Sequence, residues 1–299
     1  ELLGVSCDNL RNKSAGFLQL VSEKIEQIFP DLEVEIINLA TLQQQLVEKM
    51  ETELDLQKYF VISLEEDWLG EDGYKLQICR PANKIKGVGP YCPRPGYPDP
   101  MIQIEEAARL SGNKKIIITD DGLFSGGTVE WVINQLQTFG KTEFVIYVPV
   151  ATQEGVDKFQ NLGIDVCQLV SLDAPKDWVC ERDLRYFVSR TGKPFRARNG
   201  KLLSVSHEGQ SVFFSKPYPK PTGWLSKSAS IPRKDVKDLS RFILQWHIDL
   251  FSGLEDIAGP FKLSDLAKLS SLHSIPYTGS IPSMDQSIKE YLNSLLKLV

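Results

Sequence analysis

Apolar residues recur along the first 170 residues with two alternating periods, one typical of helices and one typical of strands. Val34 and Ile36 alternate with glutamates, whereas the apolar positions of residues 15–29 recur at helical spacing until Pro30 ends the run. The expected strands are 32–39, 58–64, 74–79, 115–119, 144–150 and 164–169, with 58–80 as a hairpin, and the expected helices are 15–29, 41–54, 102–110, 127–139 and 153–162. Such alternation predicts an α/β fold, in which a parallel sheet is flanked by helices.

The regular alternation of strand and helix patterns ends beyond Pro175, which predicts that the chain has two structurally different parts. Residues 1–180 are expected to form the α/β domain, and residues 181–299 a basic, proline-containing extension or small domain. An apolar helical stripe over 235–257 and a last helix from Ser283 to Val299 make this extension mixed but mainly helical.

The composition is that of a globular protein and excludes several classes. Of the 299 residues, 42% are hydrophobic and 24% are charged, which argues against a collagen-like or disordered chain. We expect no membrane span, because no run approaches 18 uncharged apolar residues. Five cysteines without a CxxC pair and three scattered histidines argue against a zinc site and favour a reducing, cytoplasmic setting. The chain opens at Glu1 without a basic-then-apolar leader, which leaves its natural start open.

The net charge of −5 hides an asymmetry between the two parts. Residues 1–180 carry −12 and residues 181–299 carry +7, with 14 basic and 4 acidic residues between Arg182 and Arg241. Such a stretch can bind nucleic-acid phosphates, or it can be a solvated surface that balances the acidic part. We favour the solvated-surface interpretation over nucleic-acid binding, which stays the alternative for this segment.

One motif combines groups that suit a sugar phosphate. Residues 115–133 read KIIITDDGLFSGGTVEWVI, so a strand leads into Asp120 and Asp121 and then through a glycine-rich turn into a helix. The backbone N–H groups of such a turn suit a phosphate, and the hydroxyls of Ser125 and Thr128 add donors. The two carboxylates suit ribose hydroxyls, or a Mg²⁺ ion held through its water shell. The motif therefore predicts a ribose 5-phosphate site; the alternative is a polar strand-to-helix loop without a ligand.

This motif resembles the phosphoribosyl pyrophosphate (PRPP) motif of the type I phosphoribosyltransferases. Asp120 and Asp121 match the acidic pair of that family, whereas Thr119, Gly122 and Phe124 depart from its usual residue types. The resemblance implies that the acidic pair is catalytic and that the following loop binds the phosphate of PRPP or of a nucleoside 5′-monophosphate. The residues of this loop are Gly122, Leu123, Phe124, Ser125, Gly126, Gly127 and Thr128.

The resemblance also implies an activity and its partners. A transferase of this family passes the phosphoribosyl group of PRPP to a nitrogen acceptor and releases pyrophosphate, with Mg²⁺ as cofactor and as a homo-oligomer. The acceptor is expected near residues 173–183, where Trp178 suits stacking on a base. The alternatives on the same fold are a non-catalytic regulator that senses PRPP or nucleotides or binds nucleic acid, and an antiphage-defence effector.

The pyrophosphate side of the site has two candidate loops in the sequence. Residues 6–14 (SCDNLRNKS) offer Arg11 and Lys13, whereas residues 63–67 (SLEED) are acidic and would repel pyrophosphate. The proline- and glycine-rich segment 81–100 lies where the family carries a mobile hood, which implies that Lys84, Lys86 and Arg94 close over the pyrophosphate. An ordinary helix entry and an exposed linker are the alternatives for these two segments.

Overall fold

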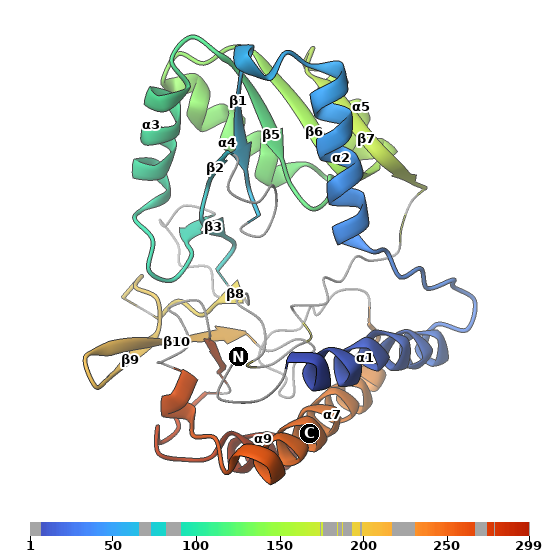
Figure 1. Ribbon diagram of the computed structural model, residues 1–299, viewed down its shortest axis with the longest axis vertical. Helices are drawn as coiled ribbons and strands as arrows, with labels where there is room; N and C mark the ends of the chain where they lie inside the picture. The colour runs from blue at the N-terminus through green and yellow to red at the C-terminus, as the bar shows by residue number, and fades with distance from the viewer. Residues whose placement is uncertain are drawn as a thin grey trace. The chain divides into compact units, whose positions relative to one another are not determined.

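The computed structural model describes most of the chain, and its contacts separate two compact units (Figure 1). The described residues are 7–65, 73–81, 91–173, 175, 184, 187, 193–197, 199–216, 231–266, 274–277 and 279–298. One unit, called here the sheet unit, comprises Ile37–Cys79 and Tyr91–Lys176. The other, the terminal unit, comprises Glu1–Ile36, Arg80–Pro90 and Asp177–Val299.

A five-stranded parallel sheet forms the centre of the sheet unit. Its strands are β1 (Tyr59–Ser63), β2 (Tyr74–Lys75), β5 (Lys115–Thr119), β6 (Phe144–Thr152) and β7 (Asp165–Leu172), and their order is β2-β1-β5-β6-β7. Every pairing is parallel, which confirms the predicted α/β class. Three consecutive isoleucines of the central strand β5 are fully buried, as expected for a strand covered on both faces.

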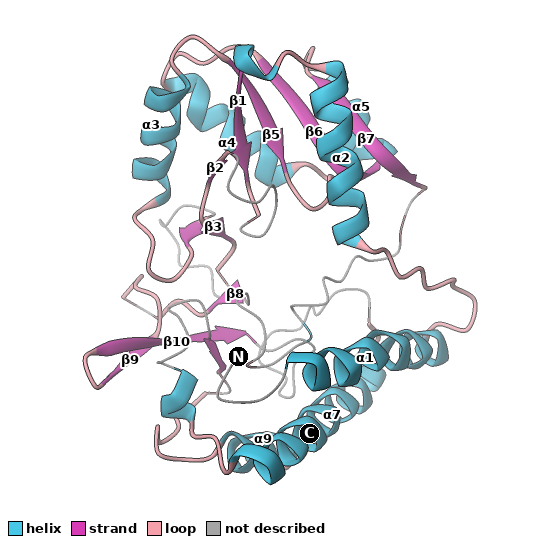
Figure 2. Cartoon of the chain, viewed as in Figure 1, coloured by secondary structure: helices cyan, strands magenta, loops and turns pink. Residues whose placement is uncertain are grey.

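Helices cover both faces of this sheet (Figure 2). They are α2 (Leu39–Glu53), α3 (Pro100–Ser111), α4 (Gly127–Thr138) and α5 (Gln153–Gln160), and a 3₁₀ turn, η1 (Leu56–Lys58), precedes β1. Leu46 and Met50 of α2 pack with Ile117 of β5, whereas α3, α4 and α5 pack with Ile116 and Ile118. Successive residues of a strand point to opposite faces, so α2 lies on one face and the other three helices on the opposite face.

Two predictions for the first 80 residues are wrong. β1 and β2 are parallel neighbours, with Ile62 opposite Tyr74, and not the hairpin expected over 58–80. The alternating stretch 32–39 forms no strand, because it joins no ladder. A short antiparallel ribbon of β3 (Ile78–Cys79) and β4 (Cys92–Pro93) follows β2 instead.

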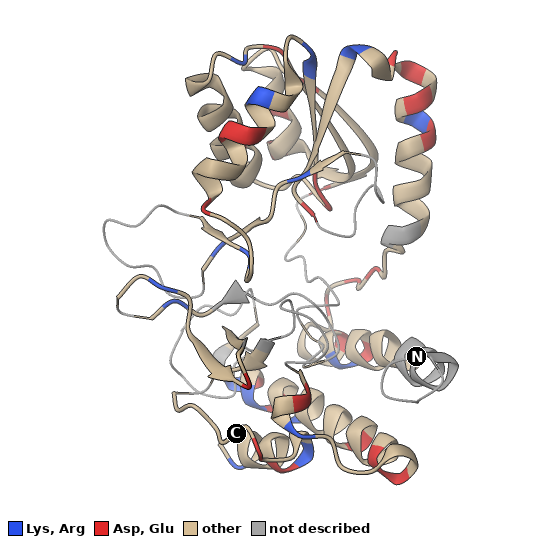
Figure 3. Cartoon of the chain, turned by 60° about the vertical axis from the view of Figure 1, so that its left-hand side comes forward, with Lys and Arg blue, Asp and Glu red and all other residues tan. Residues whose placement is uncertain are grey.

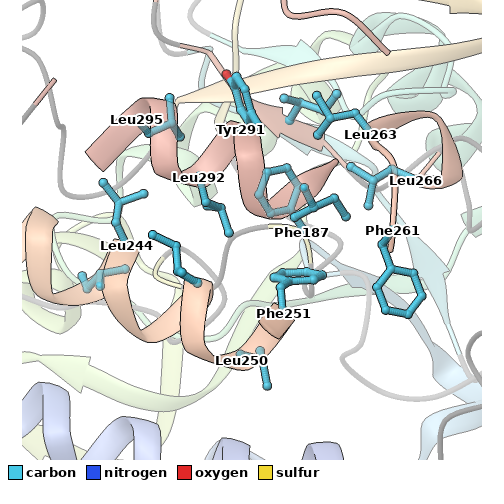
Figure 4. Close-up of a cluster of buried hydrophobic side chains, with 14 of the residues drawn as sticks. Phe187, Leu244, Leu250, Phe251, Phe261, Leu263, Leu266, Tyr291, Leu292 and Leu295 are labelled. Atoms are coloured by element: carbon cyan, nitrogen blue, oxygen red, sulfur yellow. The ribbon is translucent and has the colours of Figure 1, made fainter. Parts of the chain in front are cut away.

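The terminal unit has its own apolar core (Figure 4). Its described helices are α1 (Cys7–Ile28), α7 (Arg233–Ala258) and the shorter α9 (Ile288–Leu296). Its strands are β8 (Lys193–Pro194), β9 (Ser204–His207), β10 (Gln210–Lys216) and β11 (Ser274–Pro276), and η2 (Leu263–Asp265) is a 3₁₀ turn. The expected helices over 235–257 and near the end of the chain are confirmed, so the C-terminal region is mixed and mainly helical.

The first helix packs within the terminal unit. Phe17 of α1 is fully buried, and its ring centroid lies 4.1 Å from that of Trp246 on α7. The predicted division at residue 180 assigned these first residues to the α/β domain, whereas their contacts in the structure group Glu1–Ile36 with the C-terminal region. Among the described residues, no helix combines the length and the apolarity needed to cross a membrane.

Candidate functional site

The loop that follows β5 is anchored to the sheet by Leu123. Its N–H donates to Val150 O (2.9 Å), and its carbonyl accepts from Thr152 N (2.9 Å), so one residue of the loop pairs with β6 like a strand. Leu123 is 1% exposed. Because Leu123 is fixed, the polar residues on either side of it are held at the carboxyl end of the central strand, where parallel sheets bind ligands.

Gly126 turns this loop into helix α4. Its φ of +65° is left-handed, and a Cβ added there would lie 2.4 Å from Cε2 of the buried Phe159. The N-cap residue of α4 is Gly126, which has no side chain with which to cap the helix, and Glu130 N donates to Gly126 O (2.9 Å). The N–H groups of a helix start and the positive end of the helix dipole suit a phosphate.

The far side of the loop is held by helix α5 and its N-cap. The Thr152 hydroxyl donates to Phe124 O (3.1 Å), and Lys158 Nζ donates to Ser125 O (3.2 Å). A Cβ at Gly155 would lie 2.3 Å from Phe124 O, so only glycine lets the helix approach this closely. These contacts with α5 fix the backbone of the loop, and the Ser125 side chain remains exposed to solvent.

The side chains of Phe124 and Thr128 complete the loop. The Phe124 ring folds back against Gly122, where an added Cβ would lie 2.8 Å from Cε2 of the ring. The Tyr91 hydroxyl donates to Thr128 Oγ1 (3.2 Å), and a hydroxyl that accepts one hydrogen bond can donate another. The loop 122–128 is therefore held in one conformation by its contacts, with Tyr91 as a neighbour that the sequence did not indicate.

Three carboxylates meet at the ends of the neighbouring strands β1 and β5. Glu65, Asp120 and Asp121 each offer an oxygen, and these oxygens lie within 4.8 Å of one another. Glu65 reaches this place because Leu64 N donates to Thr119 O (2.9 Å) and extends the pairing of β1 with β5. Figure 3 shows acidic positions in the loops that leave the central strands. Carboxylate oxygens are the ligands that Mg²⁺ prefers, so this cluster fits the predicted cofactor.

Glu65 also forms a buried ion pair with Arg94. Arg94 Nη2 lies 3.2 Å from Glu65 Oε2, and the two side chains are only 9% and 13% exposed. The position of Arg94 follows from β4, since Arg94 N donates to Gln77 O (2.9 Å). Its Nε has no hydrogen-bond acceptor among the described residues. The guanidinium therefore places a positive charge against one carboxylate of this cluster, that of Glu65.

The predicted site residues lie in different parts of the structure. Asp120, Asp121 and the loop 122–128 are adjacent, whereas Arg11 and Lys13 lie on α1, in the terminal unit. Residues 7–14 are helical, and not the loop expected for a pyrophosphate site, because α1 begins at Cys7. Lys84, Lys86 and Trp178 lie outside the described residues.

The sequence interpretation missed Glu65 and Tyr91. Arg94 was expected to close over the pyrophosphate, and in the structure it is paired with Glu65. The signal for Glu65 was present: the segment 63–67 follows a strand, and it was set aside only because it is acidic. Parallel strands end at one edge of a sheet, so the segments after β1 and β5 had to meet once these strands are neighbours.

Comparisons with known proteins give weak similarities. No protein-family model and no curated protein matches the sequence. Among solved structures, the protein TT1426 of Thermus thermophilus is similar at 17% identity, over 49% of this chain and 88% of that chain, with a TM-score of 0.30. A purine phosphoribosyltransferase of Pyrococcus horikoshii is similar at 14% identity, over 48% of this chain and 86% of that chain, with a TM-score of 0.22. The α/β class of this chain follows from its own parallel sheet and not from these similarities.

Proposed function

We propose that the loop 120–128 binds the ribose 5-phosphate part of PRPP or of a nucleoside 5′-monophosphate. The N–H groups at the start of α4 and the hydroxyls of Ser125 and Thr128 hold the 5′-phosphate. The carboxylates of Asp120 and Asp121 accept hydrogen bonds from the ribose hydroxyls.

One observation carries this proposal: an acidic pair at the end of the central strand continues into a glycine-rich loop that leads into the start of helix α4. Each half suits one part of a sugar phosphate, and the anchored Leu123 keeps the two halves at a fixed separation. Gly126, whose left-handed backbone and contact with Phe159 allow only glycine, brings the chain from this loop into α4.

The reaction that this arrangement supports best is phosphoribosyl transfer to a nitrogen acceptor. The acceptor nitrogen attacks C1 of the ribose, and the bond from C1 to the pyrophosphate oxygen breaks. Positive charge develops on the ring in this step, next to Asp120 and Asp121. Holding the phosphate and the ribose hydroxyls also orients C1 for the attack, so the contribution of the chain is positioning and electrostatics.

The carboxylates of Glu65, Asp120 and Asp121 would hold the Mg²⁺ ion of such an enzyme, directly or through water. Bound there, the ion supplies positive charge that offsets the charge of the pyrophosphate. Arg94 adds a permanent positive charge at the same edge, since it is paired with Glu65. The proposal includes a homo-oligomer in the cytoplasm, as the family resemblance and the cysteine usage imply.

A second candidate function is nucleotide binding without transfer. The observation that favours it is Glu65 itself, because a carboxylate at the segment after β1 disfavours pyrophosphate in the absence of a cation. A nucleoside 5′-monophosphate lacks the pyrophosphate and needs only the loop 120–128.

Release of pyrophosphate separates the two candidates. PRPP, MgCl₂ and a panel of nitrogenous bases are incubated with the parent protein and with Asp121→Asn, and Asp165→Asn on the exposed start of β7 is the control. We expect release by the parent and the control and a large loss in Asp121→Asn. If no base supports release while AMP still binds, the second candidate holds and transfer is contradicted.

A further inference from the structure

Two thiols face each other across the β3–β4 ribbon. Cys79 and Cys92 are direct partners in the antiparallel register, and their Sγ atoms lie 3.6 Å apart. Directly opposed residues of antiparallel strands have Cα atoms roughly 4.5–5.5 Å apart, within the range of about 4.4–6.8 Å over which disulfides form. A change of side-chain torsion angles is therefore enough to bring the two sulfurs to bonding distance.

The two thiols differ in exposure. Cys92 is fully buried, whereas Cys79 is only partly buried. An oxidant from solvent therefore meets Cys79 first, and Cys92 stands behind it as the second thiol. In a reducing compartment such a pair stays reduced and closes only on oxidation, as redox-sensing pairs do.

We propose that Cys79 and Cys92 are a redox-active pair that a peroxide closes to an intramolecular disulfide. The Cys79 thiolate attacks one peroxide oxygen, the O–O bond breaks, and the leaving hydroxide takes a proton to become water. The sulfenic acid so formed is attacked by the Cys92 sulfur, and the hydroxyl leaves with the Cys92 proton as a second water. Overall, the two thiols lose two electrons and two protons, and the peroxide is reduced to two waters.

The strand that carries Cys92 also carries two side chains of the candidate site. Tyr91, directly before Cys92, donates to Thr128 Oγ1, and Arg94, two residues after it, pairs with Glu65. A disulfide fixes β4 to β3 in this arrangement and so restricts both side chains. Less ordering is then required when a ligand binds, and the oxidised protein binds it more tightly. This second step rests on the proposed function, whereas disulfide formation does not.

Peptide mapping tests the thiol pair independently of any ligand. The protein is treated with hydrogen peroxide, the cysteine thiols that remain reduced are alkylated, and tryptic peptides are separated without reduction. We expect residues 76–84 joined to residues 87–109, with the summed mass less two hydrogens, because trypsin does not cleave the Arg–Pro bonds within either peptide. Cys79→Ser and Cys92→Ser should each abolish this species, while Cys167→Ser should keep it. Cys167 is the matched control because it lies on another strand, β7, and burial raises the pKa of its thiol.

Two further readouts complete the test. Closing the loop across residues 80–91 should raise the thermal midpoint of the parent by roughly 5–10 °C, and that of Cys92→Ser not at all. The affinity for AMP, measured by calorimetry, should rise about 2- to 10-fold on oxidation of the parent. Absence of the joined peptide overturns the redox pair, and equal AMP affinity of the two forms overturns its link to the site. If AMP binds neither form, the proposed function has failed, and the peptide map still decides the redox pair.

Discussion

Replacing Gly126 by alanine tests the geometry of the loop most sharply, because two separate effects act on one methyl group. The φ of +65° is a backbone conformation that side chains disfavour, and the added Cβ would lie 2.4 Å from Cε2 of Phe159. Phe159 is fully buried in the core of the sheet unit, so its ring has little room to move. Gly140 supplies a matched control, since its φ is +80° and nothing lies within 4 Å of an added Cβ.

The two effects have separable magnitudes. The left-handed conformation costs an alanine about 1–2 kcal/mol, and forcing an extra methyl into a packed core costs about 1–3 kcal/mol more. We therefore expect Gly126→Ala to lower the free energy of unfolding by about 2–5 kcal/mol, and Gly140→Ala by only about 1–2 kcal/mol. The difference between the two variants measures the contact with Phe159.

Urea denaturation followed by circular dichroism provides the free energies of unfolding for both variants. A third variant, Phe159→Leu, replaces the ring by a smaller side chain and so makes room for the added methyl group. The double variant with Gly126→Ala should therefore lose less free energy of unfolding than the sum of the two single variants. Equal destabilisation by Gly126→Ala and Gly140→Ala, together with additivity in the double variant, would refute the close approach of Gly126 to Phe159.

Three further predictions concern the site and the basic segment. Asp120→Asn should weaken AMP binding by about 1.5–3 kcal/mol in calorimetry, because a charge-assisted hydrogen bond is lost, while Asp165→Asn has no effect. Glu65→Gln should lower the free energy of unfolding by about 3–5 kcal/mol, because it leaves the buried guanidinium of Arg94 without its charged partner. As the control, loss of the exposed Asp55–Lys58 ion pair should leave the urea midpoint unchanged. Gel shifts should show weak or absent nucleic-acid binding, because we interpret the basic segment as a solvated surface. A salt-sensitive complex that is lost when the exposed lysines Lys201, Lys234 and Lys237 are replaced by alanine would contradict this interpretation.

The part of the fold that the sequence predicted is the part specified by local patterns. Three isoleucines in a row predict a buried strand wherever that strand lies, and the following Asp-Asp and Gly-Gly pairs predict a turn into a helix. For the same reason the loop 120–128 was found without knowledge of any neighbour.

The features that the sequence did not predict depend on contacts between distant segments. The alternation at residues 32–39 satisfies a strand pattern, but no neighbouring strand pairs with it. An amphipathic helix such as α1 must bury one face, yet its pattern does not say against which partner, and Phe17 packs on Trp246 of α7. The place of Glu65 beside Asp120 likewise follows from the neighbouring positions of β1 and β5 in the sheet.

Calorimetric titration with PRPP in the presence of MgCl₂ tests the central claim, which is that the loop 120–128 binds a ribose 5-phosphate. The parent protein should release heat and bind PRPP, and the affinity should fall when Asp120 and Asp121 are both replaced by asparagine. The double variant should unfold at the same urea concentration as the parent, which separates loss of binding from loss of folding. A parent protein that gives no heat with PRPP, ribose 5-phosphate or AMP at millimolar concentration would contradict the claim.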